Sequence, residues 1–286
     1  MLHSLDFHSH SNASDGDLSP MDLVQRAYDA GVRFFALTDH DTVEGCHVLE
    51  KQTLPADLTF INGAEFTCVL GKQVLHIVGL NLNIHNTALS KHLEHMTNLR
   101  EERALKIDER LQKMQLPSLI DAARAQAGEA QLGRPHFAKA LIEAGVVDSE
   151  AKAFKKYLGA GKPGDVKVAW PTLEEVIGII KDAGGVSVLA HPTKYNLTLN
   201  KIRGVVSEFA SLGGQAIEVG YPGVTQDQQA SLMMLARKFE LALSGGSDFH
   251  SPEQLWTSIG CYPDFAHSGN HISDLIGIDY QSGRSA

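Results

Sequence analysis

Residues 172–192 read TLEEVIGIIKDAGGVSVLAHP, and this stretch carries the local pattern that decides the fold. Its first part predicts a helix that starts at Thr172 and is closed by Gly184 and Gly185. The apolar run at 186–190 predicts a buried strand, which ends at His191. A helix followed directly by a strand is the unit from which α/β folds are built.

The same unit recurs along the chain. Downstream, a helix near 198–212 leads to a strand at 216–219, and a helix with Leu232, Leu235, Ala236 and Phe239 on one face leads to a strand at 241–244. Upstream, a helix opened by Ser19 and Pro20 separates the first two of the predicted strands, which are 4–8, 33–37, 59–61, 65–70 and 73–80. Gly71 and Lys72 predict a hairpin turn between the last two. Alternating units predict parallel pairing, in a barrel or in a doubly wound sheet.

Residues 87–165 have a different texture. They are rich in Ala, Leu, Glu, Lys and Arg, and residues 98–114 (NLREERALKIDERLQKM) have the pattern of an amphipathic helix. We therefore expect a smaller helical insert at 87–165. The main domain would then consist of the two flanking segments, 1–86 and 166–286.

Composition limits the class of protein. The chain has 286 residues, of which 43% are hydrophobic and 21% charged, as is usual for a globular protein with a sizeable core. A net charge of −9 argues against binding duplex DNA through charge alone. Three cysteines without regular spacing, an N-terminus unlike a signal peptide and the lack of a long apolar run favour a cytoplasmic protein without a membrane span. We predict no obligatory protein partner.

Side chains that bind metals follow the predicted strands. His8 and His10 end the first strand, and Asp248 and His250 follow the last. Residues two apart on an extended backbone point the same way, so each pair can face one pocket. Asp15 lies in a polar loop that is able to fold back toward His10. The exits of barrel strands share one face, on which active sites are built. The full set of candidate ligands is His8, His10, Asp15, His40, Glu65, His76, His191, Asp248 and His250.

This set combines imidazole nitrogens and carboxylate oxygens without a thiolate, which suits Mn, Fe, Zn or Co. Nine ligands are too many for one ion, so we expect two or three ions with a carboxylate that bridges them. A single histidine at a strand end is more often a core or surface residue than a ligand. The recurrence of suitable groups after strand upon strand, in both halves of the chain, favours the metal site.

In chain order, the motifs DFHSHSNASDG, ALTDHDT, GAEFT, LHIVGL, LAHP and GGSDFH resemble those of the PHP (polymerase and histidinol phosphatase) superfamily. The resemblance covers residues 1–85 and 166–260. It implies a distorted (β/α)7 TIM-like barrel with a trinuclear metal centre, with manganese as the first choice of metal and zinc or iron as alternatives. Many members have histidine where Asp15 stands. The implied ligand sets are His8, His10, Glu65 and Asp248; Glu65, His76 and His191; and Asp15, His40 and His250.

The motif GRPHFAKAL at 133–141 is similar to the branch that includes 3′,5′-nucleoside bisphosphate phosphatases and related 5′-to-3′ exoribonucleases. In that branch the insert closes over the substrate, and the resemblance implies that Arg134 and His136 contact phosphate. The other interpretation is that this motif merely begins a helix, with Arg134 in solvent. Further candidates for substrate contact are Asn12, Lys194, Tyr195, Lys201 and Arg203.

The resemblance thus implies a phosphoesterase that removes the 3′-phosphate of nucleoside 3′,5′-bisphosphates such as pAp, with short 5′-phosphorylated RNA as a further substrate. A hydroxide that bridges two ions would attack phosphorus, and Glu65, Asp248 and His191 would act through the bound metals. Basic residues outside the metal set favour a substrate with two phosphates. The alternatives are a histidinol-phosphate phosphatase, a non-catalytic metal-stabilised PHP module, and an amidohydrolase that acts on C–N bonds.

Overall fold

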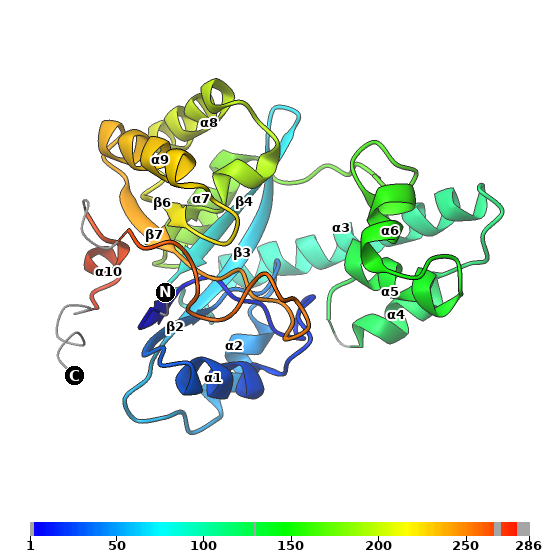
Figure 1. Ribbon diagram of the computed structural model, residues 1–286, viewed down its shortest axis with the longest axis horizontal. Coiled ribbons are helices and arrows are strands. Elements are labelled where there is room, and N and C mark those ends of the chain that lie inside the picture. Colours follow the sequence, from blue (N-terminus) through cyan, green and yellow to red (C-terminus); the bar gives the residue numbers. More distant parts are fainter. Residues whose placement is uncertain (1–2, 129, 266–269, 279–286) are drawn as a thin grey trace.

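The computed structural model describes residues 3–128, 130–265 and 270–278, so residues 279–286 of the predicted main domain lie outside it. The strands of the sheet are β1 (Leu5–Asp6), β2 (Phe34–Leu37), β3 (Thr59–Leu70), β4 (Gln73–Leu80), β5 (Val186–Leu189), β6 (Ala216–Gly220) and β7 (Ala242–Gly245). The helices are α1 (Pro20–Asp29), α2 (Glu44–Glu50), α3 (Thr87–Gln112), α4 (Ile120–Ala127), α5 (Arg134–Glu143), α6 (Glu150–Ala153), the π-helical η1 (Phe154–Leu158), α7 (Leu173–Asp182), the 3-10 turn η2 (Pro192–Tyr195), α8 (Leu199–Ser211), α9 (Gln226–Lys238) and α10 (Ile272–Leu275). Figure 1 shows their arrangement.

The seven strands lie side by side in chain order. The predicted hairpin at Gly71 and Lys72 is confirmed, and β4 is antiparallel to both β3 and β5. Parallel pairing therefore holds only for the other four neighbouring pairs. Ser9 pairs with Phe249, and Phe7 N donates to the Gly245 carbonyl at 3.3 Å, so the two edges of the sheet meet. The sheet is a nearly closed barrel, which confirms the predicted fold class.

The prediction that a short strand ends before Glu65 is wrong. β3 is one strand of 12 residues, and Glu65 lies in its middle. The Asn62–Gly63 pair is typical of a turn, but Gly63 here allows close packing. A Cβ atom at Gly63 would lie 2.9 Å from the Gly79 carbonyl oxygen and 3.0 Å from that of Leu37. Glycine therefore lets β3 run between its neighbours without interruption.

Caps fix the starts of the helices. The Ser19 side chain accepts a hydrogen bond from Asp22 N, and Pro20 is the first residue of α1, as predicted. Thr172, at which the helix before the fifth strand was predicted to start, caps α7 in a reciprocal capping box with Glu175. The long helix of the insert begins well before residue 98, because the Asn86 side chain caps α3 by accepting from two backbone N–H groups.

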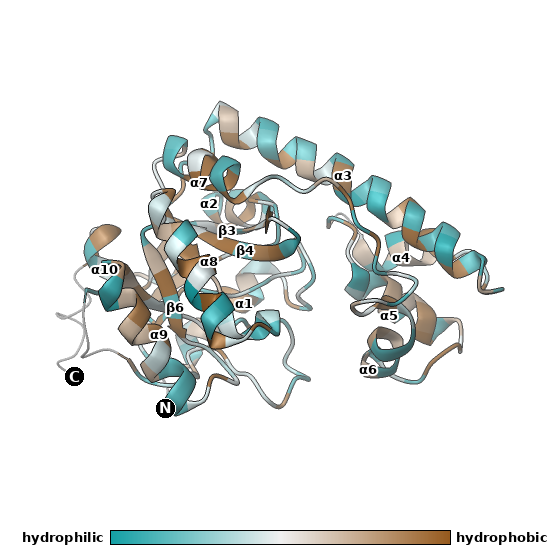
Figure 2. Cartoon of the chain, turned by 90° about the horizontal axis from the view of Figure 1, so that it is seen from above, coloured by the Kyte–Doolittle hydropathy of each residue, from teal (hydrophilic) through white to brown (hydrophobic). Residues whose placement is uncertain are grey.

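Two hydrophobic cores lie at the two ends of α3. Leu89 and Leu93, near its start, pack into the large core of the barrel. Ile107 and Leu111, near its end, pack into a second core with side chains of α4, α5 and η1. Figures 1 and 2 show α3 leading from the barrel to this group of helices. Among the described residues, no helix is both long enough and apolar enough to cross a membrane.

Candidate metal centre

The nine candidate ligands converge at the mouth of the barrel. They form four overlapping groups, and within each group the ligand atoms lie within 4.8 Å of one another. The groups are His10, Asp15, His40 and His250; His8, Glu65 and His191; His8, His10 and Asp248; and His40, Glu65 and His76. The structure thus brings together every residue of the set. It divides them differently from the predicted ligand sets, since His40 also lies beside Glu65 and His191 beside His8.

Glu65 lies at the middle of the cluster and is almost completely buried. Its Oε1 atom is 2.9 Å from His76 Nδ1 and 2.9 Å from His191 Nε2. Its Oε2 atom is 3.0 Å from His40 Nδ1 and 3.4 Å from the Nε2 atoms of His8 and His10. Each carboxylate oxygen therefore faces a different set of imidazoles, which is the arrangement that a bridging carboxylate needs.

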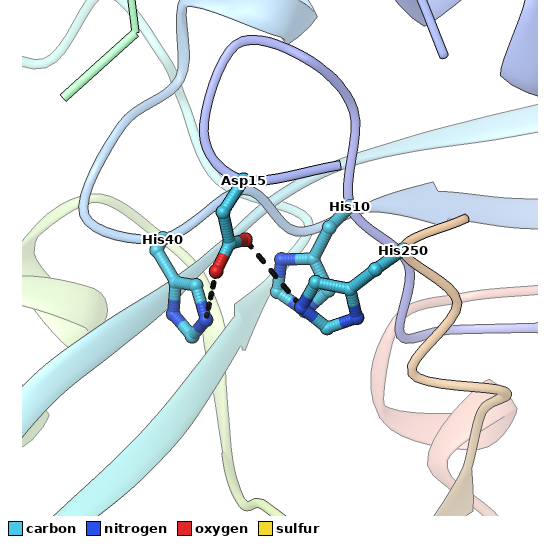
Figure 3. A group of neighbouring side chains, drawn as sticks. All are labelled: His10, Asp15, His40 and His250. Carbon is cyan, nitrogen blue, oxygen red and sulfur yellow. Dashed lines mark ion pairs between the residues drawn. The ribbon is translucent and has the colours of Figure 1, made fainter. Parts of the chain in front are cut away.

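Asp15 forms a second centre of negative charge with three histidines around it (Figure 3). Its carboxylate oxygens are 3.8 Å from His40 Nε2 and 3.4 Å from His250 Nε2. The rings of His10 and His250 stack with their centroids 4.1 Å apart. The loop after His10 therefore folds back to the barrel mouth, as its polar sequence predicts.

A buried carboxylate next to the site holds that loop. Asp39 accepts hydrogen bonds from Ser11 N, Ser11 Oγ and Ser14 Oγ, each at 2.7 Å. Burial raises the pKa of Asp39 to about 6, although the serine hydrogen bonds act in the opposite direction. Asp39 therefore orients the turn that carries Asp15.

The backbone at Asp248 is not extended, contrary to the prediction for the DFH motif. Asp248 has φ of +49°, in the left-handed region, and His191 has φ of +29°. Asp248 Oδ1 nevertheless lies 3.2 Å from His10 Nε2 and 3.7 Å from His250 Nδ1. The left-handed backbone at Asp248, rather than the alternation of a strand, brings the side chains of Asp248 and His250 to the metal cluster.

The buried carboxylates remain ionised because of the groups around them. Burial opposes charge on Glu65, yet the His76, His40 and His8 imidazoles hold its pKa well below the usual value. Burial likewise opposes charge on Asp248, whose pKa is held well below the usual value by His8 and His10. Buried carboxylates at close range require positive charge around them.

The donor set suits divalent metal ions. Among the described residues, several buried site atoms form no hydrogen bond, and these are His10 Nδ1, Asp15 Oδ1, His40 Nδ1, Glu65 Oε2 and His191 Nδ1. Those of Asp15, His40 and Glu65 lie close to charged neighbours but without the geometry of a hydrogen bond. Buried polar atoms normally have partners, so exceptions at one place need an explanation. Imidazole nitrogens and carboxylate oxygens that lack partners are the atoms that a divalent ion coordinates.

Sequence reasoning missed Glu218, a buried residue of β6. Its Oε1 atom lies 2.7 Å from His8 Nδ1, and its Oε2 atom accepts from His191 N at 2.7 Å. A carboxylate behind a ligating histidine fixes the tautomer and the orientation of the ring. The signal in the sequence was the charged residue inside the apolar strand AIEV, but it does not precede a histidine motif.

Two predicted substrate contacts lie near the metal cluster. Lys194 Nζ is 2.6 Å from Asp248 Oδ2. The Tyr195 hydroxyl is engaged with the backbone, because it donates to the Ala190 carbonyl at 2.7 Å and accepts from His76 N at 3.0 Å. Tyr195 therefore joins β4 to the end of β5, and its hydroxyl is already used.

Other predicted contacts lie elsewhere. Lys201 and Arg203 are exposed on α8, and the Arg203 guanidinium bonds to Asn200. Asn12 and His136 line a hollow of about 770 Å³ between the loop after His10 and the insert. His136 is buried, and its Nδ1 atom accepts from Gly133 N at 3.0 Å at the start of α5. The structure therefore brings none of these four residues to the cavity that contains Arg134.

That cavity, of about 840 Å³, extends from the metal cluster to the insert. Asp15, His40 and His76 line it, and so do Arg100, Arg103 and Arg134. Arg100 and Arg103 were missed, because on sequence alone they belong to the charged face of an amphipathic helix.

Three comparisons with known proteins bear on this site. A model of the PHP domain matches residues 6–181. A 5′-3′ exoribonuclease of Haemophilus influenzae is 38% identical over 268 residues, which cover 94% of this chain and 97% of that protein. A 3′,5′-nucleoside bisphosphate phosphatase of Chromobacterium violaceum is 33% identical over 258 residues, 90% of each chain. The structure of an amidohydrolase from the same organism, with bound sulfate and no metal, superposes with a TM-score of 0.87 at 32% identity, covering 96% of each chain.

Proposed function

This chain belongs to the PHP domain family, and we propose that it hydrolyses the 3′-phosphate of nucleoside 3′,5′-bisphosphates and also short 5′-phosphorylated oligoribonucleotides. Its relatives named as phosphatase and exoribonuclease confirm the predicted class, a hydrolase of phosphate esters. The choice of substrate is our inference. It depends on the arginines that line the cavity beside the metal cluster.

Two of these arginines form no ion pair among the described residues, and Asp165 is a carboxylate of the same cavity that acts on both only at longer range. Arg103 Nε donates to the Val166 carbonyl at 3.0 Å, and Arg134 Nη1 donates to the Leu158 carbonyl at 3.0 Å. Burial lowers the pKa of Arg103 to about 9, and the nearby charges of Arg134 and Arg100 add to this effect. Guanidinium groups that repel one another in one cavity are suited to bind an anion such as phosphate. This observation carries the proposal of a second phosphate.

The residues of the barrel mouth would hold two or three divalent ions, and we propose manganese from the mixed nitrogen and oxygen donors. When bound, such ions supply Lewis-acid neutralisation of the phosphoryl group and activate water near neutral pH. In the hydrolysis, the oxygen of water bonds to phosphorus, the bond between phosphorus and O3′ breaks, and O3′ receives a proton. Arg103 and Arg134 would hold the 5′-phosphate and thereby orient the 3′-phosphate toward the barrel mouth.

We further propose that residues 87–165 close over the substrate as an insert. Three contacts join this segment to the loops that carry metal-site residues. Arg100 pairs with the buried Asp41, Gln131 Nε2 donates to the Asp41 carbonyl at 2.7 Å, and Lys139 Nζ lies 2.8 Å from Asp17 Oδ1. Asp41 directly follows His40, so the position of the insert is tied to that of a candidate ligand.

The alternatives differ in what they require of the arginines. A histidinol phosphate carries one phosphate, which would occupy the metal cluster and leave Arg103 and Arg134 without a ligand. A non-catalytic module would bind metal and hydrolyse neither compound. Rates measured side by side with adenosine 3′,5′-bisphosphate and histidinol phosphate separate these alternatives, and we expect a clear preference for the bisphosphate.

Arg134→Ala tests the second phosphate directly. We expect kcat/KM for adenosine 3′,5′-bisphosphate to fall about 10- to 100-fold, because hydrogen bonds to a charged group contribute roughly 1.5–3 kcal/mol. The rate with adenosine 3′-monophosphate should change little, since that substrate has no 5′-phosphate. Arg124→Ala is the matched control, because Arg124 is exposed and pairs with Glu101. An unchanged kcat/KM for the bisphosphate in both Arg134→Ala and Arg103→Ala would refute the proposed role of the arginines.

A further inference from the structure

An exposed indole lies close to the metal centre. Trp256, in the segment that follows β7, is 61% exposed, whereas Trp170, the other tryptophan, is buried. A large aromatic ring in solvent loses the free energy of burial, so its exposure beside a functional site suggests a contact with a ligand.

Lys194 connects this ring to the metal centre. Its Nζ atom lies 5.9 Å from the centroid of the Trp256 ring and 2.6 Å from Asp248 Oδ2. One lysine side chain thus separates the indole from a carboxylate of the cluster. The cavity with the arginines opens on His40, His76 and Asp15, whereas Lys194 and Trp256 approach the cluster at Asp248.

The chemistry of the two proposed substrates differs at one atom. In both, the bond between phosphorus and O3′ of the first nucleotide breaks. In a bisphosphate the remaining phosphoryl oxygens are free, whereas in an oligoribonucleotide one of them carries the 5′-carbon of a second nucleotide. That second nucleotide must lie beyond the metal cluster, if the first nucleotide and its 5′-phosphate occupy the cavity with the arginines.

We propose that Trp256 is a stacking platform for the base of this second nucleotide, with the Lys194 ammonium near the phosphodiester. The inference rests on the proposed function and deepens it, because it names the part of the site that would accept a chain longer than one nucleotide. Stacking of a base on an aromatic side chain does not depend on base identity, so the platform suits degradation of RNA without sequence preference.

The test compares two substrates, adenosine 3′,5′-bisphosphate and a 5′-phosphorylated diribonucleotide. In Trp256→Ala, we expect the ratio of kcat/KM for the dinucleotide to kcat/KM for the bisphosphate to fall about tenfold or more, as expected for the loss of one stacked base. Trp256→Phe should keep most of the ratio, because it retains an aromatic face. Leu255→Ala is the matched control, because Leu255 is the neighbouring residue and is 98% exposed.

The bisphosphate rate serves as the internal standard for folding and metal loading. A ratio unchanged in Trp256→Ala overturns the stacking role, and so does a wild-type protein that cleaves the bisphosphate but not the dinucleotide. If the wild type cleaves the dinucleotide but not the bisphosphate, the proposed function is wrong in its main substrate. The role of Trp256 is then tested by comparing the dinucleotide rate of Trp256→Ala with that of Leu255→Ala. Loss of both activities to the same extent in Trp256→Ala also contradicts a specific contact with the second base.

Discussion

The barrel and the insert carry an excess of charge of opposite sign. Residues 87–165 contain 13 Lys and Arg against 11 Asp and Glu, whereas the rest of the chain contains 12 against 23. At the barrel mouth, Glu65 and Asp248 are buried carboxylates that require cations. At the insert, Arg103 and Arg134 donate hydrogen bonds only to carbonyl groups among the residues that the structure describes, and they can therefore bind an anion.

The difference teaches how the two regions divide the task. Under the proposed function, a phosphate ester bound to metal ions would neutralise the carboxylates of the barrel, and a second phosphate on the same molecule would neutralise the arginines of the insert. The barrel would then determine the reaction and the insert the substrate. Substitutions that remove one element at a time can break or sharpen this division.

The largest effect is expected for Glu65→Gln. The amide keeps the shape but loses the charge shared by five histidines, so we expect a loss of bound metal. The fall in kcat/KM should exceed the roughly 100-fold that follows removal of a residue that only orients a ligand. Metal content by elemental analysis and phosphatase rates are the measurements. Glu174→Gln, on the exposed face of α7, is the control. A full complement of ions in Glu65→Gln would show that this residue does not bridge.

The second effect concerns the joint between the two regions. Arg100 pairs with Asp41, whose carboxylate is completely buried and also accepts from Thr67 N at 2.7 Å. Arg100→Ala leaves that charge without its cation, and we expect a loss of about 3 kcal/mol in the free energy of unfolding. Urea denaturation measures it.

The exposed pair Arg124–Glu101 calibrates that experiment, because Arg124→Ala should cost less than about 1 kcal/mol. If Arg100→Ala costs no more than Arg124→Ala, the insert is not tied to the barrel at this point. The barrel and the insert would then be less strongly coupled than their contacts indicate.

The smallest of the three effects is expected for Glu218→Gln. The amide can accept from only one of its two present donors, His8 Nδ1 and His191 N, so one of them loses its partner. We expect metal affinity to fall about 10- to 100-fold, while a high metal concentration restores activity. Glu208→Gln, on the exposed surface of α8, is the matched substitution. Equal metal affinity in the two variants would contradict the orienting role of Glu218.

The sequence allowed the barrel and the convergence of the candidate ligands to be predicted because their signals are local. Apolar runs define strands, and a strand exit followed by HSH or SDFH marks the barrel mouth. Glu65 was predicted as a candidate ligand, but it was placed just after a strand and not within one. The reason is that Asn62 and Gly63 resemble a turn, and only the close approach of the neighbouring strands explains the glycine.

The recognition residues could not be predicted in the same way. Arg103 lies on a helix face whose pattern is typical of solvent exposure, and only the packing of α3 beside residues 166–170 brings it to the cavity. Glu218 is one carboxylate in a buried strand, and its role depends on a histidine 210 positions away in the chain. Contacts of this kind arise from tertiary structure and leave no periodic trace in the sequence.

The left-handed backbone at Asp41, His191 and Asp248 has a consequence for protein engineering. Non-glycine residues in this region cost of order 1–3 kcal/mol each, and glycine would relieve that cost. At His191 and Asp248 the replacement would remove a candidate metal ligand, and at Asp41 it would leave Arg100 without its partner. Gln115 and Glu240 have positive φ away from the metal cluster, so a search for thermostability should try glycine there and leave the three site positions unchanged.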